Sequence, residues 1–175
     1  MASPWGWRRH DIVDVLKGQF KNNLVAQSLS KLYVHIIFHI KNNSCQIRKQ
    51  ERDELFAYMA SIIKDNQSIP ILINGVENHV HILCVMSKNI SLAKLVEEIK
   101  RHSSRWIKTK DKYYNQFSWQ GGYGGFSVSS SLYNRTKNYI SRQEEHHKKL
   151  SFKEEYLLFL KEYGIEYNEE YLWRD

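Results

Sequence analysis

The sequence predicts an α+β fold, in which a ferredoxin-like split βαβ unit builds one antiparallel sheet and further helices follow at the C-terminus. Three observations lead to this prediction. Strand and helix patterns follow one another in the order β-α-β-β-α-β, the dipeptide Asn74-Gly75 marks a hairpin, and two more helical patterns come after the last strand. A length of 175 residues fits one compact domain with an appended helical tail.

The first strand and helix are read from their apolar spacing. The stretch "KLYVHIIFHI", residues 31–40, is rich in β-branched and aromatic residues and predicts a strand. One face of that strand carries Tyr33, His35, Ile37 and His39. The helix predicted over 48–66 has an apolar stripe made of Leu55, Phe56, Met59, Ile62 and Ile63.

A hairpin and a second helix follow. The stretch "IPILINGVENHVHILCVMS", residues 69–87, predicts two strands around the Asn74-Gly75 turn, the second of them running from His79 to Met86. Ser91 is a candidate N-cap for the next helix. The apolar stripe of that helix consists of Leu92, Leu95, Val96, Ile99 and Trp106.

The last part of the chain combines a glycine-rich segment with two helices. "FSWQGGYGGFSVSSS", residues 117–131, predicts one or two strands broken by a flexible turn, and residues 132–147 predict a helix. Ser151 begins another helix that we expect to end at Gly164. The expected organisation is a loosely ordered extension over 1–27, a domain over 28–150 and a C-terminal helical tail over 151–175.

Charge is spread unevenly along the chain. Residues 88–150 hold 13 Lys and Arg against 5 Asp and Glu, a balance of +8, whereas residues 151–175 hold 3 against 7, a balance of −4. A basic middle fits a polyanion such as nucleic acid, and an ordinary solvated surface is the alternative. Two cysteines do not form a disulfide scaffold, so a reducing, cytoplasmic location is expected. No apolar run reaches the ~18 residues of a membrane span.

Two histidines stand one residue apart in "NHVHILCVM", residues 78–86. Because strand side chains alternate, His79 and His81 project from the same face and could chelate one metal ion. Glu77 shares that face, as a third ligand or as a charge at the edge of the sheet. The alternative for the histidines is a hydrogen-bonded pair in a polar seam.

A tyrosine and a glutamine share one face of the helix over 132–147. Tyr139 and Gln143 are four residues apart, so one lies above the other, and His146 or His147 would continue the row. With an ordinary pKa of ~10, a tyrosine needs a metal or a cationic setting before it can attack anything. The alternative is a tyrosine with a purely structural role.

A basic stripe, defined as Arg101, Arg105, Lys108 and Lys112, has spacings of four, three and four. This spacing predicts one side of the second helix, suited to a phosphate backbone, with Trp119, Tyr113, Tyr114 and Tyr123 as rings for unpaired bases. A solvated face is the alternative. "GGYGG" is followed by no Gly-Lys-Ser/Thr, so no nucleotide cofactor is indicated.

Three segments together resemble a known family. In order and spacing, "NHVHILCVM", "FSWQGGYGGFSVS" and "YISRQEEHH" resemble the single-tyrosine HUH transposases of small bacterial insertion sequences. This is the IS200-like transposase family, which includes REP-associated tyrosine transposases. The resemblance covers about residues 28–175.

The resemblance implies a metal-dependent transposase that cleaves and rejoins single-stranded DNA, folded into hairpins at element ends, without ATP. His79, His81 and Gln143 match the family's ligands for magnesium or manganese. Tyr139 matches the nucleophile that forms a 5′-phosphotyrosine link and releases a 3′-OH.

The resemblance also implies a homodimer in which the tyrosine helix can complete the partner's site, with the glycines at 121–125 as a flexible link to that helix. The sequence leaves open whether Tyr139 acts in cis or in trans. A non-catalytic regulator that binds single-stranded nucleic acid on the same fold is the alternative function. An HUH replication initiator or relaxase is a further one, although those proteins usually run longer or carry paired tyrosines.

Overall fold

The structure, a computed structural model, describes residues 28–42 and 44–173. The expectation for residues 1–27 therefore lies outside the described residues. Four antiparallel strands form one sheet in the order β2-β3-β1-β4. The strands are β1 (Leu32–His39), β2 (Ile69–Gly75), β3 (His79–Met86) and β4 (Gly124–Val128). With one helix after β1 and one after β3, this order confirms the predicted split βαβ sheet.

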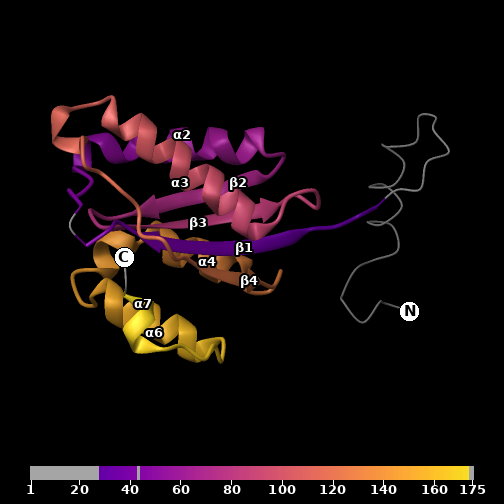
Figure 1. The fold of residues 1–175 in the computed structure, drawn as a ribbon. Coiled ribbons are helices and arrows are strands. Elements are labelled where there is room, and N and C mark those ends of the chain that lie inside the picture. The colour runs from indigo at the N-terminus through magenta and orange to yellow at the C-terminus, as the bar shows by residue number, and fades with distance from the viewer. Residues whose placement is uncertain (1–27, 43, 174–175) are drawn as a thin grey trace, which may run out of the picture.

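Helices cover both faces of the sheet, as Figure 1 shows. One face is covered by α2 (Lys49–Asp65) and α3 (Leu92–Lys108). Beneath the other face lie α4 (Tyr133–Ser141), α5 (Gln143–His146), α6 (Phe152–Glu162) and α7 (Glu169–Leu172). A 3-10 helix, Lys112–Tyr114, follows α3. Within the described part of the chain, no helix is long and apolar enough to cross a membrane.

Alternation along β1 and β3 separates an apolar face from a histidine-bearing face. Val34, Ile36 and Phe38 of β1 enter the main core, where they pack with residues of α2 and α3. The intervening positions of the two strands include His35, His79 and His81, all buried beneath α4, α5 and α6. We call this second side of the sheet the site face.

The turn between β2 and β3 lies later in the sequence than the predicted position at Asn74-Gly75. Asn74 and Gly75 are the last residues of β2 and pair with His81 and Val80, so the turn lies over residues 76–78. A Cβ on Gly75 would collide with the backbone carbonyl of His79. The glycine is therefore required by the close approach of two strands rather than by a special turn conformation.

The helix predicted over 132–147 is divided into α4 and α5. The side-chain amide of Asn74 donates to the carbonyls of Ile140 and Ser141, at 2.7 and 3.3 Å, where α4 ends. Arg142, between the two helices, has a non-helical φ of −106° and ψ of 23°. A strand side chain thus satisfies the last carbonyls of α4, which lets the chain change direction before Gln143.

The glycines at 121–125 do not form a link to the tyrosine helix, contrary to the expectation. Gly124 and Gly125 belong to β4, where a Cβ would lie 2.8 Å from the ring of Tyr156 and 2.6 Å from Leu92 Cδ2, respectively. They make room for α6 and α3 to pack on the sheet. The preceding loop is held by the Lys100 ammonium, which donates to carbonyls of residues 120–122. The chain reaches α4 through residues 129–132 instead.

Candidate metal centre and active site

The histidine pair of β3 is fully buried on the site face. The Nδ1 atom of His79 lies 2.6 Å from Asn78 Oδ1, and since that oxygen can only accept, His79 carries its proton on Nδ1. His81 Nδ1 lies 3.0 Å from His35 Nε2. In both His79 and His81 the Nε2 atom is buried and has no hydrogen-bond partner.

These two orphaned nitrogens fit a metal ion. Burial, followed by the neighbouring imidazole of His81, holds the pKa of His79 well below its ordinary 6.5, and burial lowers the pKa of His81 as well. Both rings are therefore neutral near neutral pH, which is the form that binds metals through a lone pair. Partners of the second ring nitrogen, such as Asn78 and His35, are the contacts that usually orient metal-binding histidines.

Two more side chains join the histidine pair. His147, just after α5, and Glu155 of α6 form with His79 and His81 a cluster whose ligand atoms all lie within 4.8 Å of one another. The Oε2 atom of Glu155 is 3.0 Å from His147 Nε2 and 3.4 Å from His81 Nε2. Glu77, considered above as a third ligand, forms an ion pair with Arg52 at 3.3 Å.

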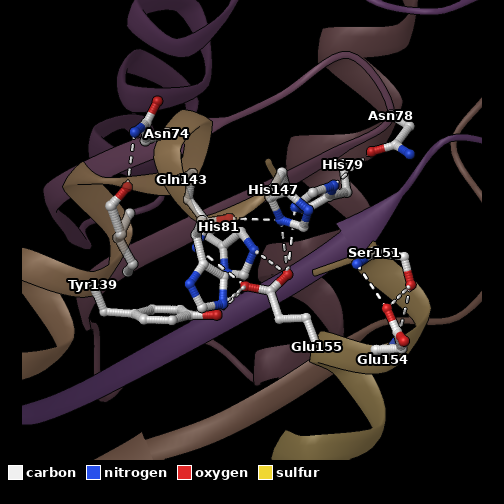
Figure 2. Close-up of polar contacts among 12 residues, drawn as sticks. Asn74, Asn78, His79, His81, Tyr139, Gln143, His147, Ser151, Glu154 and Glu155 are labelled. Atoms are coloured by element: carbon white, nitrogen blue, oxygen red, sulfur yellow. Dashed lines mark hydrogen bonds and ion pairs between the residues drawn. The ribbon is translucent and has the colours of Figure 1, made fainter. Parts of the chain in front are cut away.

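Gln143 and Tyr139 reach the same place from α5 and α4, as Figure 2 shows. The buried Gln143 amide donates to Glu155 Oε1 over 3.2 Å, and its oxygen lies 3.0 Å from His147 Nε2. The hydroxyl of Tyr139 donates to the same Glu155 oxygen. The ring of Tyr139 is centred 6.0 Å from that of His81. One chain therefore brings the tyrosine, the glutamine and both predicted histidines together.

The electrostatics of the tyrosine and the carboxylate are coupled. Burial, followed by the negative charge of Glu155, raises the pKa of the Tyr139 hydroxyl well above its ordinary 10. Burial alone would raise the pKa of the Glu155 carboxyl, but the hydrogen bond from His147 and the nearby imidazole of His81 outweigh it and hold that pKa well below its usual range. At neutral pH the site therefore pairs an ionised carboxylate with a neutral tyrosine.

The sequence analysis placed His146 or His147 in the row of Tyr139 and Gln143 without assigning either to the site, and it did not consider Glu155. His147 follows Gln143 by four residues, and this helical spacing was a usable signal. Glu155 carried no comparable signal, because it lies on a separate helix and meets the strand histidines only through the packing of α6 on the sheet.

The basic stripe does not lie at the candidate metal centre. Arg101, Arg105 and Lys108 lie on α3, which covers the opposite face of the sheet (Figure 1). Lys112 lies beyond the end of α3, in the 3-10 helix, so the four residues do not share one helix as predicted. All four side chains are exposed. Of the aromatic residues considered with them, Tyr114 and Trp119 are buried in the core, whereas Tyr113 and Tyr123 are exposed.

Comparisons with known proteins add a family and two similar folds. The family described as IS200-like transposases matches residues 28–143. A candidate transposase from Deinococcus radiodurans R1 has 19% identity and a TM-score of 0.53, over 70% of this chain and 98% of that one. A REP-associated tyrosine transposase bound to a REP hairpin has 12% identity and a TM-score of 0.54, over 74% of this chain and 76% of that one. No curated protein matches the chain.

Proposed function

Because the chain belongs to the family of IS200-like transposases, we propose that it cleaves and rejoins single-stranded DNA through a covalent bond between Tyr139 and the DNA. The observation that carries the proposal is the meeting of Tyr139 with a buried set of metal-binding side chains. A tyrosine used only for packing would not need two buried imidazole nitrogens without a hydrogen-bond partner beside it. The family match and the cluster support the same assignment from independent directions.

His79, His81 and Gln143 are the proposed ligands of a divalent ion, magnesium or manganese. When bound, such an ion withdraws charge from the oxygens of the scissile phosphate and so lowers the barrier to attack. The strand fixes the two imidazoles, and Asn78 and His35 orient them through their second nitrogens. Gln143 is held by its contacts with Glu155 and His147.

Tyr139 is the proposed nucleophile. Its phenolic oxygen gives up its proton and forms a bond to phosphorus while the bond from phosphorus to the 3′-oxygen breaks. The departing 3′-oxygen takes up a proton, which leaves a 5′-phosphotyrosine and a free 3′-OH. The helix that carries Tyr139 is held against its own sheet, because Asn74 donates to the last carbonyls of α4. In this arrangement the tyrosine serves the histidines of its own chain.

The proposed substrate is single-stranded DNA folded into a hairpin. One of the similar structures is a transposase bound to a REP hairpin, and this chain shares its fold. The exposed basic stripe is proposed to contact the phosphate backbone outside the metal centre. A homodimer that holds two DNA ends is also proposed, on the resemblance alone. No nucleotide cofactor takes part in the proposed reaction.

Covalent capture of DNA tests this function. The full chain is incubated with labelled single-stranded DNA from the flanks of its own gene, with Mn²⁺ or Mg²⁺, and adducts are separated on a denaturing gel. We expect an adduct with the wild type and none with Tyr139→Phe, which lacks only the nucleophilic oxygen. Tyr133→Phe is the matched control, because Tyr133 lies on the same helix and packs against Tyr33.

An adduct that persists in Tyr139→Phe would show that another group is the nucleophile. DNA binding by the wild type with no adduct at either metal would instead support the regulator that binds single strands without cutting them.

A further inference from the structure

We propose that Glu155, supplied by α6, is itself a ligand of the metal ion and at the same time positions Tyr139, with one carboxylate oxygen for each role. This inference rests on the proposed metal-dependent function. It adds a charged ligand from the C-terminal tail to a site that is otherwise built from the sheet, from α4 and α5, and from His147.

Burial and the packing of α6 hold Glu155 in the site, so its position is not that of a loose surface side chain. Its side chain is only 2% exposed, which is rare for a carboxylate. The start of α6 is fixed by a capping box between Ser151 and Glu154, drawn in Figure 2. Tyr156 and Leu160 of the same helix pack with Ile37 and Phe126 of the sheet, so the helix cannot rotate Glu155 away from the histidines.

The distances around Glu155 Oε2 are close to those between ligands of one ion. This oxygen lies 3.0, 3.4 and 3.6 Å from the Nε2 atoms of His147, His81 and His79. Two ligand atoms that each lie about 2.1 Å from a shared ion are separated by about 3.0–3.4 Å. Direct hydrogen bonding explains the contact of this oxygen with His147 but not its contacts with His79 and His81, whose Nε2 atoms have no hydrogen-bond partner.

Charge gives a second reason. The imidazoles of His79 and His81 and the amide of Gln143 are neutral, and a doubly charged ion in a buried site needs a negative charge nearby. Among the described residues, Glu155 is the acidic member of the cluster. A carboxylate oxygen is also the ligand type that magnesium and manganese prefer, whereas imidazole alone favours zinc or nickel. Glu155 should therefore help to select which metal the site binds.

The other oxygen of the carboxylate faces the nucleophile. Oε1 accepts the hydroxyl proton of Tyr139 in a hydrogen bond and also accepts from the Gln143 amide at 3.2 Å. Because both oxygens belong to one rigid carboxylate, the position of the tyrosine hydroxyl is tied to the position of the metal. Nucleophile and ion are thus set at a constant separation before DNA arrives.

Metal titration of the full chain tests the proposal. Binding of Mn²⁺ and Zn²⁺ is measured by calorimetry for the wild type, Glu155→Gln and Glu154→Gln. We expect Glu155→Gln to weaken Mn²⁺ binding at least about tenfold and to weaken Zn²⁺ binding less, because the imidazoles remain. Glu154→Gln removes the same charge from the adjacent, exposed position and retains a capping residue, so it should bind both ions as the wild type does.

A second measurement separates ligation from structural support. With Co²⁺ in the site, loss of a carboxylate ligand changes the visible absorption spectrum, whereas a helix that merely packs would leave it unchanged. Melting curves check that Glu155→Gln is folded. If it is not, Glu155→Asp retains the charge but shortens the reach by one methylene, and the same weakening and spectral change are expected.

The outcomes distinguish this inference from the proposed function. Wild-type affinity and an unchanged Co²⁺ spectrum in a folded Glu155 variant would overturn the ligand role. If His79→Ala/His81→Ala nevertheless abolishes binding, the histidine metal centre stands without Glu155. A wild-type chain that binds none of these ions would overturn both.

Discussion

Hydrogen bonds between neighbouring side chains determine which atoms of the cluster carry protons. Asn78 holds the proton of His79 on Nδ1, His35 faces Nδ1 of His81, and Glu155 accepts from Tyr139. Each of these contacts leaves a defined atom directed toward the cluster: the Nε2 atoms of His79 and His81 and one carboxylate oxygen. The ionisation of the cluster therefore follows from its hydrogen bonds and its burial, before any ligand is considered.

Acid should destabilise the metal-free protein through its buried histidines. Burial lowers the pKa values of His35, His79 and His81 in the folded chain, whereas the unfolded chain takes up these protons near pH 6.5. Their contribution is therefore fully present above about pH 6.5 and is lost as the pH falls. For each of these histidines, the free energy of unfolding falls by up to about 1.4 kcal/mol for every pH unit below that value. Urea unfolding with a chelator, between pH 7.5 and 5.5, measures this slope.

A His35→Asn variant should show a shallower dependence on pH than the wild type. A flat profile for the wild type over this range would contradict the assignment of neutral buried imidazoles.

Among the helices and strands, the sheet separates the main core from the cluster of candidate metal ligands. α2 and α3 close the main core on one face, and α4, α5 and α6 build the cluster on the other. Tyr139 lies on α4, and the change of direction at Arg142 allows Gln143 of α5 to be buried as well. α3 carries most of the basic stripe on the face away from the cluster, so a DNA strand that touched both would have to pass around an edge of the sheet.

The basic stripe is tested by the salt dependence of DNA binding. If Arg105 and Lys108 each contact a phosphate, log K should fall by ~0.7 per contact for each log unit of salt. The Arg105→Gln/Lys108→Gln variant should then flatten the slope by roughly 1.4. Lys49→Gln/Lys64→Gln, which removes two exposed charges from α2, serves as the control. An unchanged slope in the first variant would show that the stripe is an ordinary solvated face.

The whole molecule brings both parts of the candidate active site together within one chain. Tyr139 and the histidines meet because α4 packs on β2 and β3 of its own sheet and is fastened there by Asn74. α6 then covers the site face and adds Glu155. A tyrosine that left for a partner would have to break the contact with Asn74 and the contact with Glu155.

Mixing two inactive proteins tests action within one chain. We combine His79→Ala/His81→Ala with Tyr139→Phe under conditions that allow subunit exchange, and assay DNA cleavage. We expect the mixture to remain inactive, since no chain in it holds both an intact tyrosine and intact histidines. Recovery of cleavage would show that the tyrosine helix exchanges between subunits, and a differently tagged wild-type pair controls for exchange itself.

Local pattern in the sequence was enough for most of the elements and for the placement of four residues of the candidate site. Alternation predicted β1 and β3 and put His79 and His81 on one face, and helical spacing aligned Tyr139 with Gln143, because both periodicities act over a few residues. What depended on distant contacts was decided by the tertiary structure. Asn74 divides the tyrosine helix, glycines of β4 admit Tyr156 and Leu92, and α6 carries Glu155 to the histidines. These pairs lie far apart along the chain, and only the packing of helices on the sheet determines which residues meet.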